Sequence, residues 1–149
     1  MTATNLTWIL RLPAQAEHLR VIREQVREAA QRMGCEAECI NEIVLAVNEA
    51  CMNVIQHAYC GRDDGEITLR MRNNADRIVV EVEDTAPPVD AAQIAPRCLD
   101  DIRPGGLGTH FMRTIMDECV YGRTCRGDGN LLRMTKAIRP KKSARDLET

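Results

Sequence analysis

Three polar residues in one stretch of sequence have types and spacing suited to catalysis beside a bound cation. Glu49 and Asn53 are four residues apart, and His57 follows after the same interval. In a helix, steps of four place side chains on one stripe. A carboxamide oxygen can ligate a hard cation such as Mg²⁺, and a carboxylate one turn away can orient or deprotonate a nucleophile. A solvated stripe of an amphipathic helix is the alternative explanation.

A fourth polar residue, Asp84, stands where the strand-like run IVVEVED meets a segment that contains prolines. In that position its carboxylate can project beyond the edge of a sheet and accept a hydrogen bond from an exocyclic amine. A turn-forming aspartate is the alternative, because Asp is common where a strand passes into an irregular segment.

A glycine-rich run, RPGGLGT, covers residues 103–109 just before an expected helix. Glycines have no side chain, so the backbone N–H groups around them can approach phosphate oxygens at a helix N-terminus. The run is not a Walker A loop, which requires Gly-Lys-Ser/Thr, and it lacks the early strand of a dinucleotide-binding fingerprint. Phosphate binding and a flexible hinge both remain open for it.

The elements that must position these residues can be read from the hydrophobic periodicity. Apolar and polar residues alternate up to Pro13, which predicts a first strand. Helical spacing over residues 14–33, with Gly34 as a C-terminal cap, predicts a first helix. A second helix is predicted over residues 36–59, with a broad apolar face that it buries.

The second half of the chain reads as a hairpin, a long loop and a second pair of strands. The hairpin covers residues 65–84, with its turn at 73–76, and the loop covers 85–108. A short helix over 109–117 and strands over 119–123 and 130–138 follow. Because the connections are mostly hairpins, we expect a two-layer α+β sandwich with a mostly antiparallel sheet and the helices on one face.

Size and composition are those of one globular domain. The chain has 149 residues, of which 44% are hydrophobic and 28% charged, with a formal net charge of −2. We expect a single domain over residues 1–138 and a polar tail over 139–149. Few aromatic residues and no basic surplus argue against a nucleic-acid partner. No run of apolar residues is long enough to span a membrane, and no export signal is seen, so we expect a cytoplasmic protein.

The cysteines are expected to be reduced thiols. There are seven, an odd number, at Cys35, Cys39, Cys51, Cys60, Cys98, Cys119 and Cys125. Cys35 and Cys39 are spaced to share a helical face, but no further pair has the matching spacing of a zinc site.

Taken together, three segments resemble the motifs of a known superfamily. NEACMNVIQHAY resembles the N-box of the GHKL ATPases, to which gyrase, MutL and the ATP domains of histidine kinases belong. VEDTAPPVD resembles their first glycine box, and GGLGTHFMRTIMDECVY resembles their second. Nearly the whole chain is similar to the small anti-sigma-factor serine/threonine kinases of bacterial partner-switching systems. The resemblance implies a Bergerat-type ATP-binding fold and the cofactors ATP and Mg²⁺.

The resemblance also implies roles for individual residues. Glu49 matches the general base of the family, Asn53 matches its Mg²⁺ ligand, and Asp84 matches the acceptor of the adenine amine. Thr135 matches a polar residue on the strand under the nucleotide. The lid that covers the phosphates is matched by Gly105, Gly106, Leu107, Gly108 and Thr109.

The function that follows from the resemblance is a protein kinase that regulates transcription by partner switching. It would phosphorylate a serine or threonine of an anti-sigma factor antagonist, a protein that competes with a sigma factor for the kinase. A homodimer is left open. One departure favours an alternative, a non-catalytic ATP-binding module: Thr85 and Ala86 follow Asp84, where the family usually has Asp-x-Gly. A histidine-kinase-type domain is a weaker alternative, since no dimerisation helices with a phosphoacceptor histidine are present.

Overall fold

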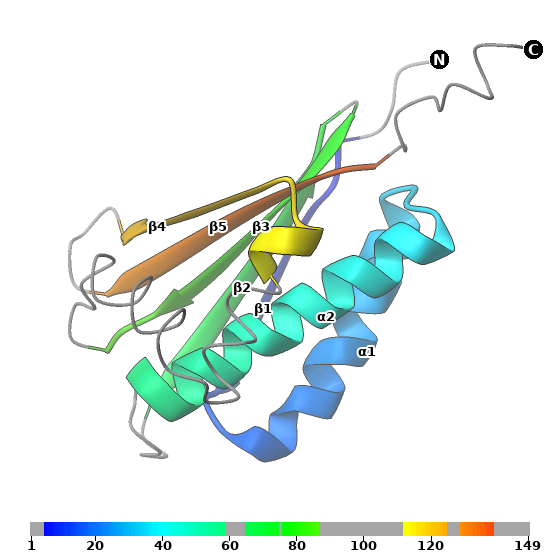
Figure 1. Cartoon of the computed structure of the whole chain (residues 1–149). Helices are drawn as coiled ribbons and strands as arrows, with labels where there is room; N and C mark the ends of the chain where they lie inside the picture. The colour runs from blue at the N-terminus through cyan, green and yellow to red at the C-terminus, as the bar shows by residue number, and fades with distance from the viewer. Residues whose placement is uncertain (1–4, 59–64, 75, 87–111, 125–128, 139–149) are drawn as a thin grey trace, which may run out of the picture.

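A single antiparallel sheet organises the molecule. The computed structural model describes residues 5–58, 65–74, 76–86, 112–124 and 129–138. The sheet has the strand order β1-β2-β3-β5-β4, and each neighbouring pair is antiparallel. The strands are β1 (Thr7–Pro13), β2 (Glu66–Asn73), β3 (Arg77–Asp84), β4 (Glu118–Arg123) and β5 (Asn130–Ala137). The helices α1 (Leu19–Arg32) and α2 (Ala37–Asn53) lie together on one face of it (Figure 1). The predicted two-layer α+β fold is confirmed.

The core lies between the helices and the sheet. Alternate residues of the three central strands point toward the helices, as the period of a strand requires. These residues are Ile67, Leu69 and Met71 on β2, Ile78, Val80 and Val82 on β3, and Leu132 and Met134 on β5, and all are buried. The register keeps them on the same face, since Leu69 is opposite Val82 and Val82 is opposite Leu132. This one-sided burial is what the alternation in the sequence predicts.

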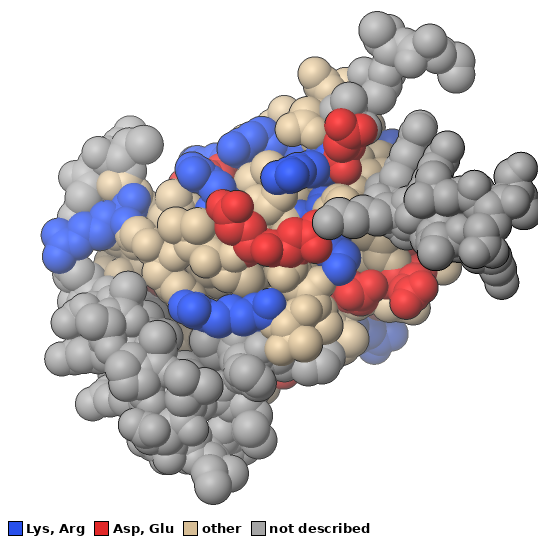
Figure 2. All heavy atoms as spheres, turned by 45° about the horizontal axis from the view of Figure 1, so that its top comes forward, with Lys and Arg blue, Asp and Glu red and all other residues tan. Residues whose placement is uncertain are grey.

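The opposite face of the sheet is covered by paired charges. Arg70 forms an ion pair with Glu83, and the carboxylate of Glu81 lies 2.9 Å from a guanidinium nitrogen of Arg72 and 2.9 Å from one of Arg133. Burial raises the pKa of Glu81, but the hydrogen bonds and positive charges of the two arginines outweigh it and hold that pKa below its usual range. Figure 2 shows acidic and basic side chains interspersed rather than gathered by sign.

The first predicted helix is divided in two. A 3-10 turn over Ala16–His18 begins two residues later than the predicted start at residue 14, and α1 itself begins at Leu19, five residues later. Its end agrees with the prediction. Gly34 has a positive φ of 90°, and the N–H of Cys35 donates to the carbonyl oxygen of Ala30. Only a residue without a Cβ adopts this left-handed conformation at little cost.

The second predicted helix changes its geometry near the candidate site. Its apolar face is buried as expected, at Cys39, Ile40, Ile43, Val44, Ala46, Val47, Ala50 and Cys51. Directly after Asn53 the backbone becomes a π-helix over Val54–Ala58. The four-residue stripe that holds Glu49 and Asn53 therefore does not continue with α-helical geometry to His57. Short π-helical turns inside helices are frequent at functional sites.

The hairpin between β2 and β3 has a shorter turn than predicted. Asn73 was expected in the turn, but it is the buried last residue of β2 and lies opposite Ile78. Its Oδ1 accepts a hydrogen bond of 2.6 Å from the backbone N–H of Leu6, the residue before β1. The contact between β1 and β2 therefore continues one residue beyond the start of β1. The turn is instead organised by Asn74, whose Oδ1 accepts from the N–H groups of Asp76 and Arg77.

The chain between β3 and β4 is described only at its two ends. Thr85 and Ala86 follow β3, and residues 112–115 are helical, within the short helix predicted over 109–117. Met112 and Met116 belong to the core. Among the described helices, none has the length and apolar character needed to cross a membrane.

Candidate active site

The contacts between α2 and β5 show which ends of the two elements meet. Lys136 Nζ lies 3.0 Å from Glu42 Oε2. Cys39 Sγ lies 3.5 Å from the carbonyl oxygen of Ala137. Later residues of β5 are thus beside earlier residues of α2, so the two elements run in opposite directions, as Figure 1 also shows.

This arrangement brings the candidate residues to one end of the molecule. At a rise of about 1.5 Å per residue, Asn53 lies about 16 Å beyond Glu42 along α2. At about 3.4 Å per residue, Asn130 lies about 20 Å from Lys136 along β5, in the same direction. Asp84 ends β3 beside the start of β5. The C-terminal end of α2 and the Asp84 end of β3 therefore lie on the same side of the molecule.

Glu49 is positioned by the buried face of α2. Its neighbours Val47, Ala50 and Cys51 are fixed in the core, while Glu49 itself is half-buried at the border of that face. Burial raises the pKa of its carboxyl group above the usual glutamate range. A carboxylate with a raised pKa is a better proton acceptor, provided that it is still ionised at the working pH. Its placement therefore suits a general base.

Asn53 is the last residue of α2, one turn after Glu49. The residue is half-buried, and its amide oxygen, Oδ1, is buried. An amide oxygen is a neutral ligand of the hard kind that Mg²⁺ accepts. No group of three or more His, Cys, Asp or Glu residues within the described segments could hold a metal ion by itself. Mg²⁺ often binds through one or two protein oxygens together with substrate phosphates, an arrangement that an amide oxygen at Asn53 suits.

Asp84 is held by several hydrogen bonds at this end of the molecule. The side chain is buried, and its Oδ1 accepts hydrogen bonds from Ala86 N (2.9 Å), Asn130 Nδ2 (2.9 Å) and Asn130 N (3.4 Å). Burial raises the pKa of Asp84, and these hydrogen bonds oppose the rise without cancelling it. All three bonds hold the same oxygen, so they fix the direction of Oδ2. The carboxylate is thus pre-positioned as an acceptor.

Gly129 allows β5 to start close to Asp84. A Cβ at this glycine would stand 1.9 Å from the carbonyl oxygen of Asp84 and 3.0 Å from its carbonyl carbon. Both atoms belong to the backbone, so no side-chain rearrangement can relieve the clash. Without a glycine at this position, Asn130 could not take its place against Asp84.

Thr135 is not brought to this group of residues. It lies opposite Val79 in the register, whereas Lys136, the next residue, contacts Glu42 on α2. Since successive side chains of a strand point to opposite faces, Thr135 points away from the helices. The helix side of the sheet therefore holds the other four polar residues, Glu49, Asn53, Asp84 and Asn130. Thr135 lies on the opposite face.

The expected lid lies outside the described residues. This applies to Gly105, Gly106, Leu107, Gly108 and Thr109, whose predicted role in covering phosphates stays a prediction. The two residues that follow Asp84, where the family usually has Asp-x-Gly, are Thr85 and Ala86, and both are described. Ala86 is buried and donates its N–H to Asp84, and it does so without the glycine that the family usually has nearby.

The sequence alone does not indicate that Asn130 is the hydrogen-bond partner of Asp84. It predicts Asn130 only as the first residue of a strand. The partner of Asp84 is found in the sequence only if β3 is known to pair with β5 rather than with β4, which comes between them in the chain. The glycine directly before Asn130 was a usable signal, because a glycine at a strand start often marks a close backbone approach.

Comparison with known proteins identifies the family. A family model described as "Histidine kinase-like ATPase domain" matches residues 12–136. Among curated proteins, "Serine-protein kinase RsbW" of Bacillus pumilus is 37% identical over 119 residues, covering 73% of this chain and 74% of the relative. The protein of the same name from Bacillus subtilis is 34% identical over 137 residues, covering 87% and 84%.

Solved structures show the same fold. The RsbU and RsbW domains of Rv1364c from Mycobacterium tuberculosis match with a TM-score of 0.66 at 18% identity, over 92% of this chain and 34% of that chain. The catalytic domain of the histidine kinase ThkA matches with a TM-score of 0.55 at 14% identity, over 90% and 99%. At these identities the likeness concerns the fold alone. With a family model that spans most of its length and relatives above 30% identity, the chain belongs to the histidine kinase-like ATPase domains of the GHKL type, among the relatives of the RsbW serine-protein kinases.

Proposed function

We propose that this protein is a serine/threonine protein kinase of the anti-sigma-factor type, which uses Mg-ATP to phosphorylate a small antagonist protein. Unphosphorylated antagonist would compete with a sigma factor for the kinase, so phosphorylation would regulate transcription by partner switching. The observation that carries the proposal is the placement of Glu49 and Asn53, one helical turn apart, at the end of α2 that lies on the same side of the molecule as the Asp84 end of β3.

Nucleotide recognition is assigned to both layers of the fold. Asp84, held through Oδ1 by Ala86 and Asn130, offers Oδ2 to the exocyclic amine of adenine. Asn53 would hold Mg²⁺ through its amide oxygen, and the glycines of residues 105–109 would supply N–H groups to the phosphates. When bound, ATP would supply the phosphoryl group, and Mg²⁺ held by Asn53 would neutralise part of the phosphate charge.

Glu49 is assigned the chemical step. Its carboxylate would accept the proton of the attacking serine or threonine hydroxyl, and its raised pKa favours that transfer. Phosphoryl transfer depends mostly on positioning and charge stabilisation, so Glu49 would act together with the groups that hold Mg-ATP.

The non-catalytic alternative is favoured by one feature, the absence of the usual glycine after Asp84. This absence is a weaker argument than it is in the sequence alone, because the backbone N–H of Ala86 donates to the Asp84 carboxylate with an alanine at this position. Both functions share nucleotide binding, so only phosphate transfer separates them.

The deciding experiment is incubation with ATP labelled on the γ-phosphate, Mg²⁺ and a candidate antagonist encoded in the same operon. We expect label on a serine or threonine of the antagonist, located by mass spectrometry, and none when Mg²⁺ is chelated. Nucleotide binding without any transfer, tested against several candidate antagonists, would support the binding module. No binding at millimolar nucleotide would contradict both.

A further inference from the structure

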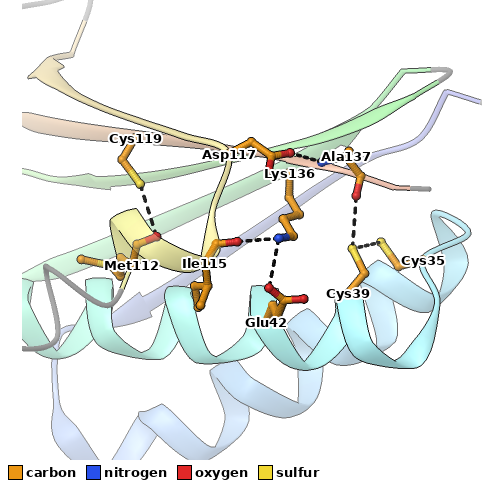
Figure 3. A network of polar contacts seen from close by, with 9 residues as sticks. All are labelled: Cys35, Cys39, Glu42, Met112, Ile115, Asp117, Cys119, Lys136 and Ala137. Carbon is orange, nitrogen blue, oxygen red and sulfur yellow. Dashed lines mark hydrogen bonds and ion pairs between the residues drawn. The ribbon is translucent and has the colours of Figure 1, made fainter. Parts of the chain in front are cut away.

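Two cysteine thiols meet where α1 gives way to α2. Cys35 follows the cap residue Gly34, and Cys39 is in the first turns of α2. Their Sγ atoms are 3.6 Å apart, as Figure 3 shows. A disulfide requires about 2.0 Å, so the sulfurs need to approach by less than the length of one bond. The two thiols are thus already in contact, with three residues between them in the chain.

The surroundings of the two thiols differ in a way that favours ionising one of them. The hydrogen-bonding contact between the two thiols lowers the pKa of Cys39, against the effect of burial, and the positive charge of Lys136 lowers it further. The hydrogen bond with Cys39 and burial raise the pKa of Cys35. Cys39 is therefore the thiol of the pair that ionises more readily. The thiolate is the reactive form of a cysteine.

Access is provided through Cys35. Cys39 is 7% exposed, and Cys35, beside it, is half-buried and reaches the surface. The other described cysteines lack these properties. Cys51 is fully buried, and burial raises its pKa to about 12. Burial also raises the pKa of Cys119, whose sulfur contacts the carbonyl oxygen of Met112 rather than another thiol.

We propose that Cys35 and Cys39 are a reversible oxidation site, which a small hydroperoxide converts into a disulfide. The thiolate of Cys39 attacks the peroxide, its S–O bond forms as the O–O bond breaks, and the departing alkoxide or hydroxide takes up a proton. Cys35 then attacks the resulting sulfenic acid. The S–S bond forms, the S–O bond breaks, and the leaving hydroxide combines with the proton of Cys35 as water. Two thiols and one hydroperoxide give one disulfide, one alcohol or water molecule, and one further water.

Oxidation changes a contact between the two layers of the fold. While Cys39 is protonated, its thiol donates a hydrogen bond to the carbonyl oxygen of Ala137 on β5. A disulfide sulfur carries no hydrogen, so this bond is lost when the pair is oxidised. Lys136, which precedes Ala137 on β5, connects the same part of α2 to the sheet by donating a hydrogen bond to Glu42. Its Nζ also donates to the carbonyl oxygen of Ile115 (Figure 3).

The site can be tested on the full chain by peptide mapping. The reduced protein is treated with hydrogen peroxide, blocked with an alkylating reagent and digested with trypsin and then with a protease that cleaves after glutamate. Glu36 and Glu38 lie between the two cysteines, so their fragments stay joined only if a disulfide connects them. We expect the joined fragments after peroxide, and their loss after dithiothreitol. Disulfides that join Cys35 or Cys39 only to other cysteines would overturn the proposal.

Two single substitutions test the assigned order. Cys35→Ser removes the resolving thiol, so peroxide should leave a sulfenic acid on Cys39 that dimedone labels. Cys39→Ser should label several-fold less at Cys35, because the favoured thiolate is absent. Circular dichroism checks that both variants are folded. If either variant is unfolded, the proposal is decided by the peptide mapping of the unmutated chain. Equal labelling of the two variants, or stoichiometric binding of Zn²⁺ alone by the parent through these thiols, would contradict the assignment.

Discussion

The two carboxylates assigned to the site are held in different ways. Asp84 is 5% exposed and has one oxygen fixed by hydrogen bonds from Ala86 and Asn130. Glu49 is half-buried on the border of a helix face, and burial raises the pKa of its carboxyl group. Burial raises the pKa of both carboxyl groups, and the difference between them is the set of hydrogen bonds that fixes Asp84 as an acceptor, which suits recognition of a ligand group. The environments of the two residues thus support different roles for the same functional group.

Glu49→Gln should separate binding from chemistry. The amide keeps the size of the side chain but loses its charge and basicity, so nucleotide affinity should change little while phosphate transfer falls by ~10²-fold or more. Transfer is measured with labelled ATP and the antagonist, and affinity by calorimetry. Glu38→Gln, an exposed residue of the same helix, is the matched control. Equal transfer by both variants would remove Glu49 from the catalytic role.

Asn130→Ala should weaken nucleotide binding by about tenfold, the scale of one hydrogen bond to a charged group. The change removes the Nδ2 donor that holds Asp84 Oδ1 at 2.9 Å. Its loss also removes a contact that lowers the pKa of Asp84, so binding should become more sensitive to acid. Affinity is measured by calorimetry across a pH series.

Thr135→Ala is the control for that experiment, because the register places Thr135 on the face of the sheet away from the helices. We expect its affinity to match the parent. A loss of affinity in Thr135→Ala with none in Asn130→Ala would restore the role that the resemblance implied for Thr135.

At the scale of elements, the junction between β3 and β5 is the part of the site with the strictest steric requirement. The end of one strand and the start of the other approach so closely that a Cβ at Gly129 would overlap backbone atoms. On the other side, α2 ends with Asn53 and continues as a π-helix. The candidate site is therefore located where two regular elements end, with its polar groups set by the positions of those ends.

Gly129→Ala should destabilise the protein by about 1–3 kcal/mol, the usual cost of forcing atoms into a packed region. It should also weaken nucleotide binding, because Asn130 is displaced from Asp84. Urea unfolding measures the stability. Gly122→Ala on β4 is the matched control, since a Cβ there has no atom within 4 Å. Similar stability of the two variants would mean that the approach of β5 to Asp84 is looser than the structure indicates.

At the scale of the molecule, the candidate ligand site joins the two layers of the sandwich. Glu49 and Asn53 belong to the helical layer, and Asp84 and Asn130 belong to the sheet. A ligand held by both layers binds the folded state and not the unfolded chain. Its binding free energy is then added to the stability of the whole domain.

Mg-ATP should accordingly raise the melting temperature. At a concentration of about 100 times the Kd, the gain is about 2.7 kcal/mol, which corresponds to several degrees for a domain of this size. Differential scanning fluorimetry with and without Mg²⁺ measures it. Asn53→Ala should abolish the part of the shift that depends on Mg²⁺, and Asn41→Ala, an exposed residue of the same helix, should retain it. An unchanged shift in Asn53→Ala would exclude Asn53 as the cation ligand.

Much of the fold follows from local patterns in the sequence. Alternation over β1, β2 and β3 and the helical spacing of α2 predicted both the elements and their buried faces, because the period of each structure repeats along the chain. Gly34 marked the end of α1 for a similar local reason, since its φ is positive. Glu49 and Asn53 could likewise be paired from spacing alone.

Contacts between distant parts of the chain could not be obtained in this way. That Asp84 meets Asn130, and that Thr135 faces the other side, depends on the pairing and register of β3 and β5, which no local period encodes. The contact of Cys39 with Ala137 likewise depends on how α2 crosses the sheet. Local periodicity selects the faces of each element, but the free energy of packing those faces together selects which polar groups become neighbours.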